Sequence, residues 1–173
     1  MEDMNRVMII GNGGGGKTTL ALRLTKSTGL PLTEVDCIQF QAGWTRTPTE
    51  QVKTELAAVQ SGDRWIIDGF GPWESIEARA GLSDTIIFVD HPIWIHFWWA
   101  CERQVAAAKG EKRIGGPPDC DLRDVTKLMF ETLWRVHEEL RPKLVELVEK
   151  HQAAKNVIWI RSPEELDSFL SDL

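Results

Sequence analysis

Several residue types are scarce or missing in this chain, and their absence narrows the class of protein. The 173 residues contain no tyrosine and only three cysteines, Cys37, Cys101 and Cys120, which lie far apart and form no CxxC pair. An odd number of scattered cysteines favours neither a disulfide framework nor a structural zinc site. We therefore expect reduced thiols and a cytoplasmic location.

Long apolar runs are missing too. The longest apolar and aromatic block covers residues 93–100, whereas a membrane-spanning helix needs about 20 apolar residues. The N-terminus shows neither the apolar core nor the cleavage site of a secretory signal. These features predict a protein that has no membrane partner.

Runs of basic residues are also lacking, and the formal net charge is −6 at pH 7. Because proteins bind nucleic acids largely through Lys and Arg contacts to phosphates, this balance argues against direct nucleic-acid binding. Apolar residues make up 42% of the chain and charged residues 27%, as in ordinary globular proteins. The length favours a single domain over residues 1–173.

Glycine, in contrast, is concentrated near the N-terminus, where the chain fits the phosphate-binding loop (P-loop) pattern GxxxxGKT without a gap. Glycines let successive backbone N–H groups turn toward phosphate oxygens at the start of a helix. Lys17 then neutralises the β and γ phosphates, and Thr18 offers its hydroxyl to Mg²⁺. The expected ATP-binding residues are Gly11, Asn12, Gly13, Gly14, Gly15, Gly16, Lys17, Thr18 and Thr19.

A flexible glycine-rich surface loop is the alternative interpretation of this segment. An apolar β-branched run precedes the glycines, and residues 17–28 have helical periodicity that ends at Gly29 and Pro31. This strand, loop and helix context is what the phosphate-binding motif requires, so we favour the P-loop.

Apolar runs alternate with helical patterns along the rest of the chain. We expect strands at 32–38, 64–69, 85–90 and 157–160, and helices at 93–108 and from 122 onward, where Pro142 kinks or divides the helix. Capping boxes at residues 47–50 and 162–165 predict two further helix starts. The alternation predicts an α/β fold with a doubly wound parallel sheet.

Three acids, Asp36, Asp68 and Asp90, lie where expected strands end. In a parallel sheet these ends meet at the edge where ligands bind. We choose Asp68 as the second magnesium residue beside Thr18, because an acid at the end of a strand beside a P-loop positions Mg²⁺ through its waters. Asp90 is the competitor, although Pro92 favours a turn there.

The P-loop, the Asp68-Gly69 strand end, a basic segment at 109–121 and the terminal Ser162-Pro163 together resemble the nucleoside monophosphate kinase group. The closer likeness is to the adenylate kinase-related "topology modulation" proteins, and it runs through nearly the whole chain. The resemblance implies a P-loop NTPase fold with a five-stranded sheet, ATP and Mg²⁺ as cofactors, and a small lid at about 109–121.

The resemblance also implies that arginines near the lid neutralise the transferred phosphoryl group. Arg103 matches the family arginine at the end of the helix that enters the lid, and Arg113 lies within the lid. Arg141 follows the lid as a second clamp, so Lys17, Arg103, Arg113 and Arg141 are the predicted catalytic residues. Each arginine could equally be a solvated ion-pair partner.

The predicted acceptor-binding residues are Asp36, Trp44 and Arg79. If the acceptor is a phosphate, Arg79 grips it and no base is needed; if it is a hydroxyl, Asp36 accepts its proton. Adenylate kinases follow the Asp-Gly strand end with Phe-Pro-Arg, whereas residues 70–73 here read FGPW and lack the arginine. The acceptor therefore stays open between nucleoside monophosphates, nucleosides and small alcohols.

Eight tryptophans are many for this length, and Trp94 and Trp98 share one helix face. They form either an aromatic wall for a flat ligand or part of the core, and we favour the core because aromatic side chains dominate ordinary cores. Trp44 is the better candidate for stacking on a ligand.

We predict an ATP- and Mg²⁺-dependent phosphotransferase that moves the γ-phosphoryl group of ATP to a small-molecule acceptor, for example a nucleoside monophosphate. The alternative is an ATP-binding regulatory or DNA-topology-associated protein without kinase turnover. The sequence predicts no oligomeric state, because an apolar face can be core in one fold and interface in another.

Overall fold

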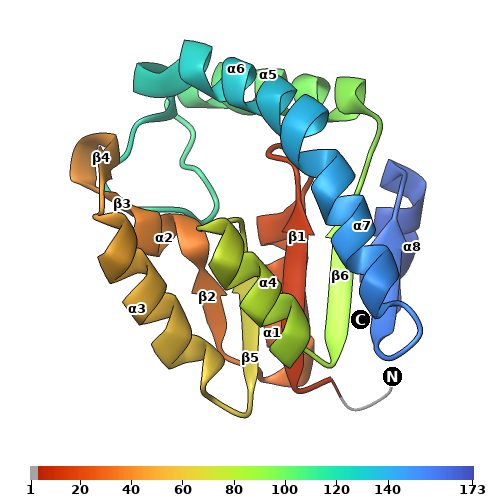
Figure 1. Cartoon of the computed structure of the whole chain (residues 1–173). Coiled ribbons are helices and arrows are strands. Elements are labelled where there is room, and N and C mark those ends of the chain that lie inside the picture. Colours follow the sequence, from red (N-terminus) through yellow and green to blue (C-terminus); the bar gives the residue numbers. More distant parts are fainter. Residues whose placement is uncertain (1–3) are drawn as a thin grey trace.

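A five-stranded parallel sheet forms the centre of the computed structural model, which describes residues 4–173 (Figure 1). Its strand order is β2-β5-β1-β6-β7. The strands are β1 (Arg6–Gly11), β2 (Leu32–Glu34), β5 (Trp65–Asp68), β6 (Thr85–Val89) and β7 (Asn156–Ile160). Because β1 is the middle strand, the P-loop leaves the sheet at the centre of its carboxyl edge.

Helices cover both faces of this sheet, as Figure 1 shows. They are α1 (Lys17–Thr28), α2 (Val35–Gln39), α3 (Thr49–Gln60), α4 (Trp73–Leu82), α5 (Ile93–Ala108), α6 (Thr126–Arg135), α7 (Arg141–His151) and α8 (Pro163–Ser171). Shorter pieces are the hairpin of β3 (Phe40–Gln41) and β4 (Thr45–Arg46), the 3-10 helices η1 (Ala42–Trp44) and η2 (Leu122–Val125), and the π-helix η3 (Val136–Leu140). The predicted α/β fold is confirmed.

The core has two layers, one on each side of the sheet. Met8 and Ile10 of β1 pack with buried residues of α3, α4 and α7. Val7 and Ile9, which alternate with them, pack with α1 and α8 on the other side. Strands that are buried on both faces need apolar residues at every position, which explains the unbroken apolar runs in the sequence.

The predicted strand at 32–38 is wrong beyond Glu34, where helix α2 begins. Val35 is buried, and Ile38 packs against the same core cluster. Residues three apart share one face in a helix but point to opposite faces in a strand, so the common burial of these two side chains favours the helix. Asp36 therefore lies in the first turn of α2.

Of the two predicted capping boxes, the one at Ser162 is confirmed, since its hydroxyl accepts a hydrogen bond from the Glu165 N–H at 3.2 Å. The one at Thr47 is wrong, because α3 begins at Thr49 and no side chain caps it. The buried Thr47 is tied elsewhere, with its N–H donating to the Gln39 carbonyl at 2.9 Å.

Two helices on the carboxyl side of the sheet differ from the predicted pattern. The long helix after residue 122 widens into η3 just before Pro142, whose missing N–H cannot continue the α-helical hydrogen bonds. The predicted core position of Trp94 and Trp98 on α5 is wrong, because the two residues are 67% and 65% exposed.

Within residues 4–173, no helix combines the length and the apolar character that crossing a bilayer requires.

Candidate active site

The P-loop passes between β6 and α5 so closely that only glycine fits at two of its positions. Gly11 has φ of +146°, and a Cβ there would lie 2.1 Å from the Val89 carbonyl oxygen. At Gly14, with φ of +64°, a Cβ would lie 2.6 Å from the His96 carbonyl oxygen. The loop then enters α1 at Lys17, so its N–H groups and the helix N-terminus face the same space.

That space is a cavity of about 760 Å³ at the carboxyl edge of the sheet. It gathers predicted site residues from six separate parts of the chain. The predicted residues that line it are Asn12, Gly13, Gly14, Gly15, Gly16, Lys17, Thr18, Thr19, Asp36, Trp44, Asp68, Arg103 and Arg113. Gly11 does not line the cavity, because it lies beneath the loop against β6.

Lys17, which is partly buried, and Asp68, which is buried, carry opposite charges close to one another beside the P-loop. Burial lowers the pKa of Lys17, and the Asp68 carboxylate opposes that shift. Burial likewise raises the pKa of Asp68, against the attraction of Lys17. The Lys17 ammonium donates to the Asn12 carbonyl at 2.8 Å, which folds the side chain over the loop.

Asp68 and Thr18 fit a magnesium site. The Thr18 hydroxyl donates to Asp68 Oδ2 at 2.9 Å, while the buried Oδ1 has no hydrogen-bond partner among the described residues. Within residues 4–173, no group of three His, Cys, Asp or Glu side chains could hold a metal ion. A site of one hydroxyl and one carboxylate suits Mg²⁺, which keeps several waters and takes further oxygens from substrate phosphates.

Arg103 on α5 and Arg113 on the lid segment (residues 109–121) bring further positive charge to the cavity. Burial lowers the pKa of Arg103, and the charge of Arg113 lowers it further. The Arg103 Nε is buried without a hydrogen-bond partner among the residues described. Cations that repel one another in a low-dielectric space are stabilised when a polyanion enters it.

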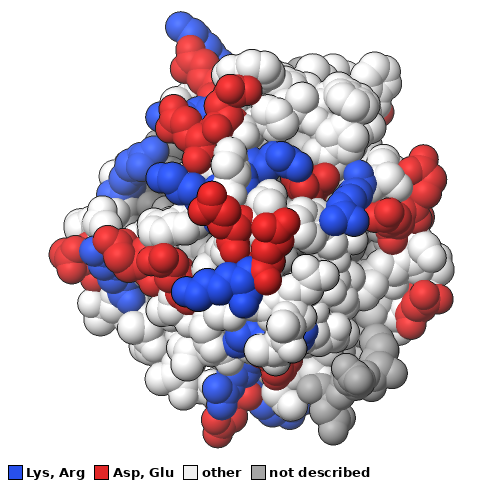
Figure 2. Space-filling view, turned by 45° about the vertical axis from the view of Figure 1, so that its right-hand side comes forward, with Lys and Arg blue, Asp and Glu red and all other residues white. Residues whose placement is uncertain are grey.

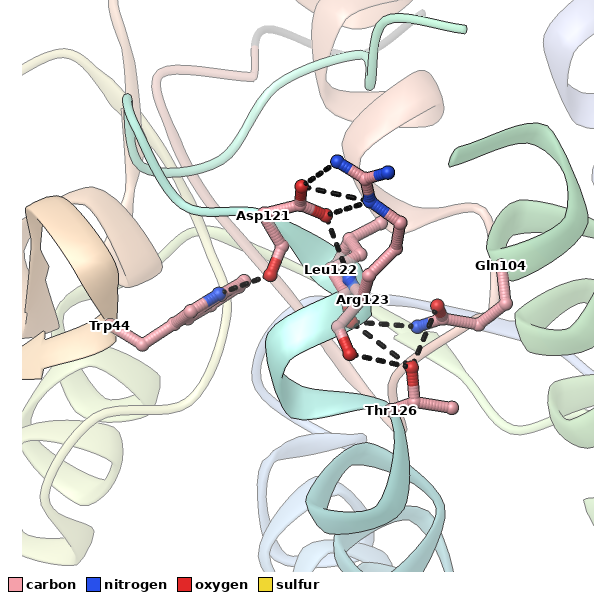
Figure 3. Close-up of polar contacts among 6 residues, drawn as sticks. All are labelled: Trp44, Gln104, Asp121, Leu122, Arg123 and Thr126. Atoms are coloured by element: carbon pink, nitrogen blue, oxygen red, sulfur yellow. Dashed lines mark hydrogen bonds and ion pairs between the residues drawn. The ribbon is translucent and has the colours of Figure 1, made fainter. Parts of the chain in front are cut away.

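The C-terminal end of the lid segment is joined to the surrounding structure. Figure 3 shows the Trp44 indole N–H donating to the Asp121 carbonyl at 2.6 Å. Next to it, Gln104 of α5 donates to the Leu122 carbonyl at 3.2 Å and accepts from the Thr126 hydroxyl at 3.1 Å. The segment itself, between α5 and η2, contains no helix or strand.

The tip of the lid segment lies against the end of β2 and the first turn of α1. The Gly116 N–H donates to the Glu34 carboxylate at 2.7 Å. The Arg113 guanidinium stacks 5.5 Å from the Trp44 ring centre. A Cβ on Gly115 would lie 2.4 Å from the Thr18 methyl group. The lid segment therefore packs directly against Thr18, one of the two predicted magnesium residues.

Besides Gly11, two predicted residues, Arg79 and Arg141, lie outside the cavity lining. Arg79 is fully buried behind it and donates to the Gly69 and Phe70 carbonyls at 2.7 and 3.0 Å, so its predicted place in the acceptor pocket is wrong. Burial lowers the pKa of Arg79 to about 10. Arg141 instead forms a two-pronged ion pair with Asp90, with contacts of 2.6 and 2.8 Å.

The cavity also contains residues that the sequence analysis did not select. Glu34, Phe40 and Arg46 line it beside Asp36. Glu34 carried no clear signal, because it follows Thr33 in a strand of only three residues. Arg46 carried none, because the two-residue strand in which it lies has no sequence pattern.

A buried histidine supports the P-loop from behind. The His96 ring Nδ1 lies 2.8 Å from the Gly13 carbonyl oxygen. Because a carbonyl oxygen only accepts, the neutral ring carries its proton on Nδ1 and donates it to the loop. Burial lowers the pKa of His96 to about 4, although the bond to Gly13 opposes the shift. His91 packs 5.6 Å away, centre to centre, and burial lowers its pKa as well.

A second hollow, of about 820 Å³, lies at the opposite end of the sheet. Its charged residues are already paired with backbone groups, since Asp84 accepts from the Arg6 N–H and Lys155 donates to the Gly81 carbonyl. This hollow has no P-loop and no buried unpaired acid, so the cavity at the carboxyl edge is the candidate active site.

The sequence matches no known family model, and it matches no curated protein. Solved structures do resemble it. The chain is similar to shikimate kinase from Acinetobacter baumannii in complex with shikimate, with a TM-score of 0.61, 12% identity and coverage of 99% of this chain and 91% of that chain. An unliganded sugar kinase from Janibacter sp. gives a TM-score of 0.51, 18% identity and coverage of 98% and 94%.

A shikimate kinase from Bacteroides thetaiotaomicron is also similar, with a TM-score of 0.50, 16% identity and coverage of 98% of this chain and 96% of that chain. At these identities the likeness concerns the fold. The chain has the P-loop kinase fold.

Proposed function

We propose that the protein is an ATP- and Mg²⁺-dependent kinase of a small molecule. One observation carries the proposal: Lys17, Arg103 and the P-loop meet in one cavity with Asp68, the buried acid whose Oδ1 lacks a partner among the described residues. This arrangement suits a triphosphate with its magnesium ion. The kinase fold of the similar structures supports it.

In the proposed reaction the chain mainly positions and neutralises charge. The P-loop N–H groups and Lys17 hold the phosphates, and Thr18 and Asp68 hold the magnesium ion and its waters. When bound, Mg²⁺ neutralises charge on the phosphate oxygens. Arg103 and Arg113 stabilise the negative charge of the transferring phosphoryl group, and the lid segment excludes water from it.

The acceptor that the site favours is a small molecule with a hydroxyl group. Asp36 lines the cavity close enough to Lys17 and Arg103 for its charge to oppose the lowering of their pKa values by burial. The hydroxyl oxygen attacks the γ-phosphorus, its proton passes to the Asp36 carboxylate, and the bond to the ADP oxygen breaks. Arg46 offers a cation to an acidic acceptor. The similar structures are named as a shikimate kinase and a sugar kinase, and these names support an acceptor that carries a hydroxyl group.

A nucleoside monophosphate is the second candidate acceptor, as the resemblance to adenylate kinase-related proteins suggests. Arg113 stacked on the Trp44 ring supports it, because a cation beside an aromatic face suits a phosphate and a base. Two observations count against this acceptor. Residues 70–73 lack the adenylate kinase arginine, and the Arg79 guanidinium already donates to the Gly69 and Phe70 carbonyls.

The test is an ADP-release assay with ATP, Mg²⁺ and separate panels of hydroxy acids and sugars, nucleosides, and nucleoside monophosphates. For a hydroxyl acceptor, Asp36→Asn lowers kcat at least about a hundredfold, because general-base catalysis contributes that much. For a monophosphate acceptor, the same variant retains kcat. No turnover with any acceptor, together with salt-sensitive DNA binding, would favour the regulatory alternative.

A further inference from the structure

The face of α5 that points away from the cavity carries an apolar stripe. Trp94, Trp98, Cys101, Val105 and Ala108 are all exposed, whereas Trp99 and Arg103 of the same helix line the cavity. The spacing of the stripe is 4, 3, 4 and 3 residues, which is the spacing of a helix seam that packs against another helix. In the described part of the chain, α5 has no such partner on this side.

Trp134 of α6 extends the stripe sideways. Its ring lies 6.4 Å from that of Phe97, which stacks in turn on Phe130 at 5.8 Å. Figure 2 shows a broad area without Lys, Arg, Asp or Glu at the upper right of the molecule, toward the end where α5 and α6 lie in Figure 1. We call this surface, made of the five stripe residues and Trp134, the α5 face.

The size of the α5 face matches half of a protein interface. Trp94, Trp98 and Trp134 are 67%, 65% and 52% exposed, which leaves roughly 400–500 Å² of indole surface in water if a tryptophan offers about 250 Å². A standard interface covers about 800 Å² per partner, and about 65% of it is apolar in homodimers, or roughly 500 Å². Patches of this size on a monomer are often functional.

We infer that the α5 face is covered by the α5 face of a second copy of this chain. A two-fold dimer needs one surface that complements itself, and the stripe meets this need because none of its residues is charged. The small Cys101 stands at the middle of the stripe, between Trp98 and Val105. Overlap of two stripes is greatest when the two-fold axis passes beside Cys101, which allows the backbones to approach there while the tryptophans pack on either side.

Charge elsewhere on the molecule favours this occupant over a membrane. The net charge of −6 opposes binding to anionic lipids, whereas Glu102 and Lys109, exposed charged residues next to the stripe in the sequence, have opposite signs. Because the α5 face lies opposite the cavity side of the helix, the dimer leaves each cavity open. The inference does not depend on the proposed kinase activity.

The experiment is light scattering coupled to gel filtration of the full chain at high and low protein concentration. The expected mass is twice the 19.6 kDa of the chain. Trp98→Glu raises the dissociation constant about thirtyfold or more, as loss of a central aromatic anchor does. Leu82→Glu, at an exposed leucine of α4, is the matched control and leaves the dimer intact. Val105→Lys repeats the test if Trp98→Glu does not fold.

Cross-linking locates the axis. Diamide oxidises two thiols to a disulfide by taking up their two electrons and two protons, so it joins Cys101 of one copy to Cys101 of the other. We expect a covalent dimer in the variant with Cys37→Ser and Cys120→Ser, and none in Cys101→Ser. A wild-type mass of one chain at all concentrations, capture on zwitterionic vesicles as a monomer, or a dimer that Cys101 does not cross-link would each overturn the inference.

Discussion

Mild acid should lower the unfolding free energy of this protein through His96, the histidine behind the P-loop. Its ring is only 2% exposed, and its pKa is about 4 in the folded chain, compared with about 6.5 in an unfolded chain. Between these values the unfolded chain binds the extra proton and the folded chain does not. The stabilising effect of the neutral ring is therefore complete above pH 6.5 and is lost as the pH falls toward 4.

The size of the effect follows from the two pKa values. A gap of about 2.5 pKa units corresponds to about 3 kcal/mol of unfolding free energy over the whole range. Most of it is lost early: the His96 contribution should fall by about 2 kcal/mol between pH 7 and pH 5. His91, whose pKa burial also lowers, acts in the same direction, and Asp68, whose pKa is raised, acts in the opposite direction.

Urea unfolding at pH 7 and pH 5 measures this loss, and the variant His96→Asn isolates the share of one ring. Asparagine places an amide N–H near the position of Nδ1 and can donate to the Gly13 carbonyl, but it does not titrate. We expect the variant to lose about 2 kcal/mol less than the wild type over this range. Equal losses in the two proteins would refute the assignment of the neutral His96 ring.

Three further predictions concern single side chains. Asp68→Asn should raise the Mg²⁺ concentration for half-maximal activity at least about tenfold, because it removes the only carboxylate expected to reach the ion; a magnesium titration checks this. Arg103→Ala should lower kcat at least about a hundredfold with the thermal midpoint little changed, and unchanged steady-state kinetics would contradict the role. Arg141→Met should destabilise the fold by about 2 kcal/mol, because it removes both charged hydrogen bonds to the Asp90 carboxylate and leaves it, among the described residues, only the 3.3 Å bond from the Trp159 indole N–H; an unaltered denaturation midpoint would count against that account.

Most of the sheet could be predicted from the sequence, because strands buried on both faces must be apolar throughout. β6 reads as a run of five apolar or β-branched residues and is buried at each one. The P-loop could be predicted equally well, because its backbone approaches β6 and α5 so closely that glycine is required at Gly11 and Gly14. Short elements were not: β2 has only three residues, too few for a pattern to show where the chain turns into α2.

Other parts depend on tertiary neighbours that no local pattern contains. Helix α4 was missed because only Ile76 and Ala80 supply its buried apolar side chains, and its largest buried residue is the charged Arg79. The exposure of Trp94 and Trp98 was missed for the opposite reason: an apolar helix stripe has the same spacing whether a core or solvent meets it. The ion pair of Arg141 with Asp90 joins residues 51 positions apart, which sequence spacing does not reveal.

The most direct test of the account is calorimetric titration of the wild type and Lys17→Ala with a non-hydrolysable ATP analogue and Mg²⁺. The account predicts one bound analogue per wild-type chain. The affinity of the variant should be at least about thirtyfold weaker, because the phosphates of the analogue lose the Lys17 ammonium as a charged partner. A far-UV circular dichroism spectrum of the variant that matches the wild type shows that the fold is retained. No binding to the wild type, or equal affinity in both proteins, would contradict the claim that this P-loop holds a triphosphate.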